Sequence, residues 1–161
     1  MSILKSTISA LIGATFLFGL PISSALAGEG EKAYKRCAAC HLPTGKGVPS
    51  TFPPIANRLT GLMDTVEGRA YLVMVTSKGL MGGITVDSVS YNSIMPPQGR
   101  MLGKKGIADV LNYIALELSA PPAGFVPFTE DEVAKTEEAH PKFNGRKVHK
   151  LRDKLFSSKS E

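Results

Sequence analysis

Tryptophan is absent from this 161-residue sequence, and only two of its residues are cysteines. Two cysteines are too few for a disulfide-dense scaffold and for a zinc site with four cysteine ligands. Hydrophobic residues make up 43% and charged residues 20% of the chain, which is ordinary globular composition. A disordered polyelectrolyte, a collagen-like repeat and a coiled-coil rod are therefore excluded, and the length suits about one domain.

The sequence also has little excess of one charge. It contains 19 Lys and Arg against 14 Asp and Glu, a formal net charge of +5. Acidic and basic residues are mixed, and no stripe of basic and aromatic residues occurs, so we expect no nucleic-acid partner. A weak positive balance favours instead a protein partner with an acidic docking face.

The longest hydrophobic run, residues 8–20, is short for a membrane span, which needs about 20 residues. A lysine precedes the run, a proline ends it, and Ala25 and Ala27 provide the small residues of a cleavage site. This pattern predicts a secretory signal peptide over residues 1–27, removed after Ala27. We expect a soluble mature protein that is exported to the periplasm and has no transmembrane segment. An uncleaved N-terminal anchor is the alternative.

Cys37 and Cys40 are followed directly by His41, in the pattern C-x-x-C-H that attaches c-type haem. Two thiols one helical turn apart can each add to a haem vinyl group and form a thioether bond. The neighbouring imidazole then offers a nitrogen that is a good ligand for the haem iron. The motif predicts one covalent haem c, with Cys37 and Cys40 as the attachment points and His41 as the proximal iron ligand.

Three other interpretations of the cysteine pair remain open. A thioredoxin-like redox pair is expected beside a βαβ pattern, which is not visible in this sequence. Half of a zinc site would need a second pair of ligands, and His140 and His149 lie far away in a polar tail. A simple structural disulfide is the third interpretation, because an exported chain sits in a compartment that favours disulfides.

Met95 is the predicted distal ligand of the iron. The two prolines that follow it fix φ and hold the loop rigid, so a thioether can be presented at little ordering cost. Met74 instead falls on a helical apolar stripe, which is typical of a core methionine. Met81 is the next candidate for the distal ligand, and Met101 or a histidine of the tail ranks after Met81.

Taken in their order along the chain, these motifs resemble those of the class I cytochromes c of the bacterial periplasm. Proteins of that family carry one haem whose iron is bound by a histidine and a methionine. The resemblance covers about residues 28–118. It implies an all-α cytochrome c fold, with three or more helices around one covalently bound haem, and an electron-transfer protein rather than an enzyme. It also implies that a carbonyl near Pro53 accepts a hydrogen bond from the His41 ring. The matching pieces are Gly30 with Tyr34, residues 37–41, 52–56 and 91–97, and the helix 107–118.

Helices are predicted over residues 28–40, 67–78 and 107–118, and the prolines and glycines of residues 42–57 predict a loop. Residues 84–91 alternate around an Asp-Ser turn and predict a small β-hairpin. In the family, the first helix crosses the C-terminal one with a glycine and an aromatic residue at the contact. Tyr71 is expected in the core, with contact to the haem or to the ligand sulfur as the alternative.

The tail, residues 119–161, is predicted to be an extension beyond the haem domain of residues 28–118. It begins with a proline-rich linker, and Thr129 with Glu132 forms a capping box ahead of a short acidic helix. A basic amphipathic helix follows, marked by Val148, Leu151 and Leu155. We expect the extension to pack on the haem domain. Docking to an acidic partner or an anionic membrane surface is the alternative.

Between residues 28 and 118 the aromatic residues are only Phe52 and four tyrosines, so the haem itself is expected to complete the core. Together these features predict a monomeric periplasmic one-electron carrier. It would shuttle electrons between a dehydrogenase or respiratory complex and a terminal acceptor, with redox proteins (a dehydrogenase, oxidase or reductase) as partners. Two alternatives are a dedicated haem subunit of a dehydrogenase or reductase complex, and a haem-based ligand binder with an open sixth position.

Overall fold

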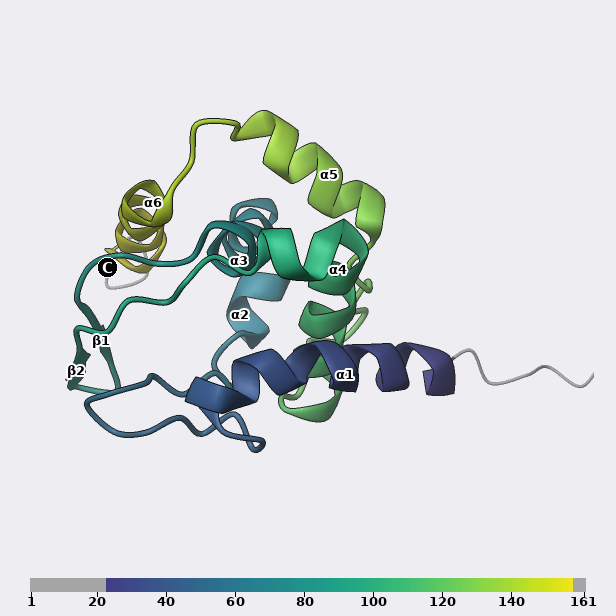
Figure 1. Cartoon of the computed structure of the whole chain (residues 1–161), viewed down its shortest axis with the longest axis horizontal. Helices are drawn as coiled ribbons and strands as arrows, with labels where there is room; N and C mark the ends of the chain where they lie inside the picture. The colour runs from purple at the N-terminus through teal and green to yellow at the C-terminus, as the bar shows by residue number, and fades with distance from the viewer. Residues whose placement is uncertain (1–22, 158–161) are drawn as a thin grey trace, which may run out of the picture.

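Helices form most of the backbone in the computed structural model, which describes residues 23–157 (Figure 1). Of the predicted signal peptide, residues 1–22 lie outside the described residues. None of the helices within residues 23–157 combines the length and the hydrophobicity of a membrane span. The elements in chain order are α1 (Ser23–His41), α2 (Thr60–Met63), α3 (Val66–Lys78), β1 (Ile84–Val86), β2 (Val89–Tyr91), α4 (Gly99–Glu117), α5 (Glu130–Ala139) and α6 (Gly145–Ser157).

The two longest helices, α1 and α4, pack against each other at a glycine (Figure 1). A Cβ atom on Gly30 would come within 2.7 Å of the α4 backbone and of Cβ of Tyr113. Only glycine therefore lets the helices approach this closely. The rings of Tyr34 and Tyr113 lie beside the contact with their centroids 5.2 Å apart. The expectation that Gly30 and Tyr34 mark this contact is confirmed.

Helix α3 begins and ends at the signals that its sequence carries. The Thr65 side chain accepts a hydrogen bond of 3.1 Å from the Gly68 N–H and so caps the first turn. Gly79, with φ of 75°, ends the helix directly after Lys78, which is the predicted last residue. Met74 on this helix is fully buried, which confirms it as a core residue. The end of α3 matters for the site because the chain turns there toward the hairpin.

Strands β1 and β2 pair antiparallel, with Ile84 opposite Tyr91. The turn residues Asp87 and Ser88 have φ values of 50° and 65°. Two consecutive residues with positive φ make the tight turn whose twist matches that of a hairpin. The predicted hairpin is confirmed, although neither turn residue is glycine.

Helix α4 begins at Gly99, eight residues before the predicted start at residue 107. Gly103, with φ of 67° and ψ of 176°, kinks it and separates a short first segment from the amphipathic helix that was predicted. Three glycines between residues 99 and 106 lower the helix propensity of this segment, so its sequence gives no helical signal. The short helix α2 was also not predicted.

The extension packs against the rest of the chain. Helix α5 contacts α3 and α4, and α6 lies on α3 (Figure 1). Val133 of α5 and Val148 of α6 are fully buried in the same core cluster as Leu72 and Leu111. One half of the predicted capping box forms, since the Glu132 N–H donates to the Thr129 hydroxyl oxygen at 3.1 Å, whereas the Glu132 carboxylate binds Arg69. The extension is therefore part of the hydrophobic core.

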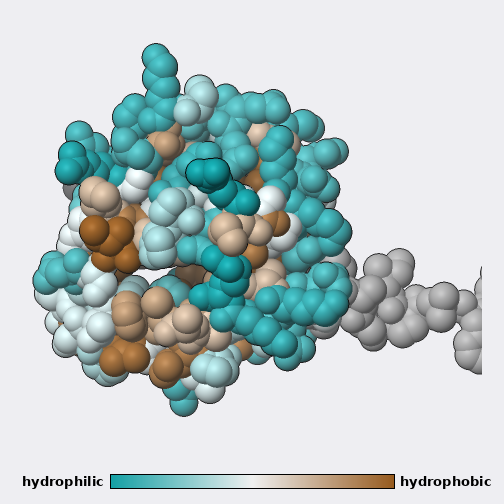
Figure 2. Space-filling model, in the orientation of Figure 1, coloured by the Kyte–Doolittle hydropathy of each residue, from teal (hydrophilic) through white to brown (hydrophobic). Residues whose placement is uncertain are grey.

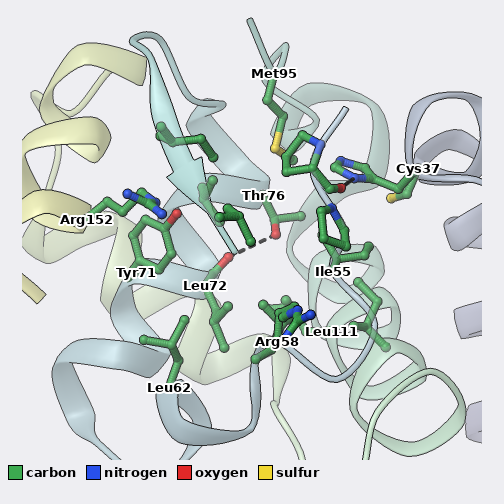
Figure 3. Close-up of a pocket in the computed structure, with 18 of the residues that line it drawn as sticks. Cys37, Ile55, Arg58, Leu62, Tyr71, Leu72, Thr76, Met95, Leu111 and Arg152 are labelled. Atoms are coloured by element: carbon green, nitrogen blue, oxygen red, sulfur yellow. Dashed lines mark hydrogen bonds between the residues drawn. The ribbon is translucent and has the colours of Figure 1, made fainter. Parts of the chain in front are cut away.

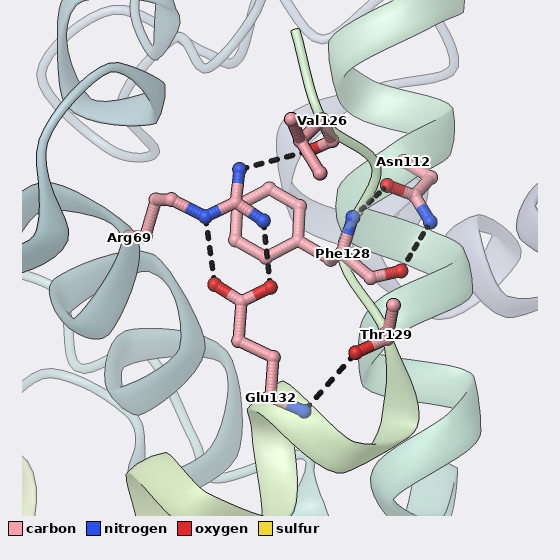
Figure 4. A network of polar contacts seen from close by, with 6 residues as sticks. All are labelled: Arg69, Asn112, Val126, Phe128, Thr129 and Glu132. Carbon is pink, nitrogen blue, oxygen red and sulfur yellow. Dashed lines mark hydrogen bonds and ion pairs between the residues drawn. The ribbon is translucent and has the colours of Figure 1, made fainter.

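Arg69 of α3 holds the start of the extension through several contacts at once (Figure 4). Its guanidinium donates two hydrogen bonds to the Glu132 carboxylate, at 2.7 and 2.6 Å, and a third to the Val126 carbonyl at 3.0 Å. It also lies 3.8 Å from the centre of the Phe128 ring. Asn112 of α4 exchanges two hydrogen bonds with the backbone of Phe128, at 2.9 and 2.7 Å. These contacts fix the linker between α4 and α5.

Candidate functional site

A cavity of about 320 Å³ is bounded by α1, α3, α4, the hairpin and α6 (Figure 3). Figure 2 shows this face of the molecule hollowed near its middle, with hydrophobic residues beside the opening. A mostly apolar cavity with a few converging polar groups is the usual form of a cofactor site. Its hydrophobic walls include Ile55, Leu59, Leu62, Leu72, Val75, Ile84, Val110, Leu111 and Ile114.

The cavity brings the predicted site residues together. Cys37, His41 and Met95 line it, and an adjoining hollow of about 90 Å³ is lined by the same three residues and by Cys40. The cysteines and the histidine come from the last turn of α1, whereas Met95 comes from the loop before α4. The fold therefore places a thioether sulfur and the C-x-x-C-H motif, which lie more than fifty residues apart, around one space.

Cys37 and Cys40 are half-buried free thiols in the structure rather than a disulfide. Burial raises the pKa of the Cys37 thiol to about 11. A reactive redox pair needs the opposite, a thiol whose pKa is lowered so that the thiolate is present near neutral pH. The environment of Cys37 thus disfavours the thioredoxin-like interpretation, and the free thiols do not support a structural disulfide.

His41 is nearly buried, with 8% of its surface exposed, and its orientation is fixed by one hydrogen bond. Its Nδ1 lies 2.8 Å from the carbonyl oxygen of Pro53. Because a carbonyl can only accept, Nδ1 carries the hydrogen and Nε2 keeps its lone pair. Burial lowers the pKa of His41, so the ring stays neutral. A neutral imidazole with a free Nε2 is the form that ligates iron, and the expected bond to this carbonyl is confirmed.

Gly47 brings the Pro53 carbonyl to the histidine. The loop folds back on itself here: the Gly47 N–H donates to the His41 carbonyl at 2.9 Å, and Val48 pairs with Phe52. A Cβ atom on Gly47, whose φ is 64°, would overlap the carbonyl oxygen of Phe52 and lie 2.6 Å from that of Pro53. Glycine at position 47 therefore permits the close approach that orients the imidazole.

Met95 is held by its backbone. Its N–H donates to the Leu80 carbonyl at 3.0 Å, and the Leu80 N–H donates to the Met95 carbonyl at 2.9 Å. Figure 3 shows its sulfur turned toward the cavity. Met81 and Met101 are 39% and 65% exposed, and neither lines the cavity, so of the methionines weighed as ligands only Met95 is in place.

Tyr71 is both a core residue and a wall of the cavity, being 7% exposed. Burial raises its pKa to about 12, and its hydroxyl lies against Arg152 of α6 (Figure 3). Arg58, Arg152 and Phe156 also line the cavity, and sequence reasoning missed all three. The amphipathic pattern of α6 shows which of its faces is apolar, but no local signal tells which neighbour that face meets.

The donor set fits a haem. An imidazole nitrogen and a thioether sulfur are ligands of haem iron, and two thiols beside the imidazole suit covalent attachment. Within residues 23–157, no group of three or more His, Cys, Asp or Glu side chains could hold a metal ion by itself. Half of a zinc site is therefore not supported by the residues that the structure describes.

Comparison with known proteins agrees with this site. The family model for cytochrome c matches residues 27–116. A cytochrome c-552 from Thermus thermophilus is 37% identical over 134 residues, which cover 82% of this chain and 86% of the relative. A second cytochrome c-552 from Thermus thermophilus is 38% identical over 109 residues, covering 66% of this chain and 82% of the relative. The chain therefore belongs to the cytochrome c family, as a class I monohaem cytochrome whose cofactor is covalent haem c with its iron.

Proposed function

We propose that the chain is a periplasmic one-electron carrier in which Cys37 and Cys40 hold the haem by thioether bonds. His41 and Met95 are its proximal and distal iron ligands. The observation that carries the proposal is that Cys37, His41 and Met95 line one apolar cavity, and that all four side chains line the hollow that adjoins it. Membership of a family of electron-transfer proteins supports the same function.

The bound haem supplies the redox chemistry, an iron that alternates between Fe(II) and Fe(III). The protein keeps the ligands still during that change. The Pro53 carbonyl orients the His41 ring, and the paired backbones of Leu80 and Met95 hold the sulfur. Because neither ligand has to move, electron transfer requires little rearrangement. The apolar walls exclude water, and a thioether ligand favours the reduced state and raises the potential.

This site supports a haem-based ligand binder less well. Such a protein needs an open sixth coordination position on the haem iron, and Met95 is placed to fill it. The visible spectrum of purified Met95→Ala beside wild type separates the two. The wild type should be low-spin in both oxidation states, with a long-wavelength sulfur-to-iron band, and should bind CO poorly. Met95→Ala should lose that band and bind CO, whereas Met101→Ala, an exposed methionine, should match wild type. A band that survives in Met95→Ala would exclude Met95 as the ligand.

Covalent attachment has its own test. Denaturing the protein in acidified organic solvent should leave the red chromophore with the polypeptide, and a Cys37→Ser, Cys40→Ser double variant should release it.

Export is tested separately. Mass spectrometry of the purified protein reports whether residues 1–27 have been removed. A chain that begins at Gly28 and comes from the periplasmic fraction supports export, whereas an intact N-terminus would favour the anchor.

The partner is a redox protein with an acidic docking face, and the contact is small and short-lived, below about 1,200 Å². Ile94, next to the proposed ligand, is 60% exposed and also lines the smaller hollow, so it offers an apolar centre for such a contact. The net positive charge steers an acidic partner toward the carrier. Association that weakens as salt is raised supports this partner. A tight complex that co-purifies regardless of salt would favour a dedicated subunit of one enzyme.

A further inference from the structure

Helix α6 forms part of the cavity wall, although the family model ends at residue 116. Arg152 and Phe156 are the two α6 residues that line the cavity. The Arg152 guanidinium lies 4.5 Å from the centre of the Phe156 ring and donates to the Thr85 carbonyl of the hairpin at 3.1 Å. It also lies against the hydroxyl of Tyr71 (Figure 3). The side chain is therefore held at the cavity from three sides.

The charges on the cavity wall do not balance. Two of its lining residues are arginines and one is a carboxylate: Arg58 forms an ion pair with Asp87. The neighbouring carboxylate on α6, Asp153, lies 3.0 Å from Nδ1 of His149, and the two form an ion pair only when that ring is protonated. No carboxylate within residues 23–157 forms an ion pair with Arg152. The cavity wall thus presents one guanidinium without an ion-pair partner among the described residues to a mostly apolar space.

A cation beside an apolar cavity is stabilised by an anion in that cavity. Arginine has five N–H donors in a planar fork that matches a carboxylate, and the Thr85 carbonyl uses one of them. Haem carries two propionate carboxylates. We propose that Arg152 binds one propionate of the haem, so that the C-terminal extension completes the cofactor site. This proposal rests on the proposed function, because it requires the haem to occupy this cavity.

A purely structural role for Arg152 is the competing explanation, since the same side chain ties α6 to the hairpin through Thr85. The two roles differ in what they do to the iron. A cation paired with a propionate disfavours the ferric state, because ferric haem carries one more positive charge than ferrous haem. A tie between two backbone segments has no such effect.

The test compares Arg152→Gln, Arg152→Lys and a matched control, Arg146→Gln, in the haem-loaded protein. Arg146 is exposed on the same helix, and its substitution makes the same change of charge. Midpoint potential and the propionate bending vibrations in the resonance Raman spectrum are measured for each. We expect Arg152→Gln to lower the potential clearly more than Arg146→Gln and to shift one propionate vibration. Arg152→Lys keeps the charge but not the fork, so its potential should stay near wild type while the vibration still shifts.

The proposal is overturned if Arg152→Gln matches Arg146→Gln in potential and leaves the propionate vibrations of wild type unchanged. If Arg152→Gln does not fold, unchanged vibrations in Arg152→Lys overturn it equally. A different result would contradict the proposed function: a wild-type protein that holds no covalent haem or that lacks the sulfur-to-iron band. If the wild type is red and low-spin but the Arg152 variants change neither the potential nor the propionate vibrations, only the proposed role of Arg152 is excluded.

Discussion

The carbonyl oxygen of Met95 occupies the place that a side chain on Gly79 would need. A Cβ atom there would overlap this oxygen and lie 2.9 Å from the nitrogen of Pro97. The backbone of Gly79, with φ of 75° and ψ of −174°, also lies in a region that is essentially restricted to glycine. The end of α3 and the proposed ligand loop are thus in direct contact, and one residue without a side chain makes that contact possible.

Gly79→Ala should therefore disturb the proposed iron ligand as well as the fold. We expect a loss of about 2–3 kcal/mol in unfolding free energy, together with a weaker sulfur-to-iron band and faster CO binding. Gly124→Ala is the matched control, because Gly124 has φ of 76° but no atom lies within 4 Å of the position that its Cβ would take. That control should cost about 1 kcal/mol and leave the spectrum unchanged. Equal spectra for the two variants would contradict the role given to Gly79.

Val148→Ala tests whether the extension belongs to the core. Val148 of α6 is fully buried, so its truncation should lower the unfolding free energy by about 2–3 kcal/mol in urea titrations. Val126→Ala, at a position 67% exposed, should change it by less than about 0.5 kcal/mol. Similar stabilities for both variants would mean that α6 does not stay packed on α3 in solution. For the same reason, deletion of residues 129–161 would remove core residues and could not isolate a docking role.

Arg69→Ala should loosen the start of the extension. It removes the paired hydrogen bonds to Glu132 and the contact with the Phe128 ring, and it leaves a carboxylate that is only 29% exposed without its partner. We expect a loss of about 2–3 kcal/mol in thermal or urea unfolding. Lys32→Ala breaks the ion pair with Glu29, in which both side chains are mostly exposed, and should have no measurable effect. A neutral Arg69→Ala would show that the network in Figure 4 does not stabilise the fold.

In the haem-free chain, in which iron does not occupy Nε2, the stability should fall in mild acid because of His41. Burial lowers its pKa from the ordinary value of 6.5, so below that value the unfolded chain takes up a proton that the folded chain does not. The contribution of His41 is complete above about pH 6.5 and is lost as the pH falls through the lowered pKa. We expect the thermal midpoint of the haem-free chain to be level from pH 8 to 7 and to decrease from about pH 6.5 to 5, above the main range of carboxylate titration.

The measurement is cleanest in a background in which His140 and His149 are replaced by Gln, since the sequence contains three histidines and His41 then remains alone. Both replaced rings lie outside the cavity wall and bond to the backbone carbonyls of Thr136 and Gly83. A midpoint that stays level or rises between pH 6.5 and 5 would show that protonation of His41 is not coupled to folding.

Local patterns predicted the elements whose signals lie within a few residues of one another. The end of α3 before Gly79 and the N-cap hydrogen bond of Thr129 each act over one helical turn, and both form as predicted. The turn at Asp87 is equally local. The first segment of α4 was missed because its glycines lower helix propensity, and the contacts that hold it come from elsewhere, as when the Gln98 N–H donates to the Thr76 carbonyl.

The sequence by itself determined the chemistry: the spacing of Cys37, Cys40 and His41 predicts a haem attachment, and the prolines after Met95 favour its loop as the proposed ligand loop. Only the tertiary structure decided which groups surround that chemistry. The Gly79 contact with Met95 and the place of Arg152 in the cavity wall each join segments far apart in the chain. Periodicity tells which face of a helix is apolar, but the partner of that face is chosen by packing of the whole fold.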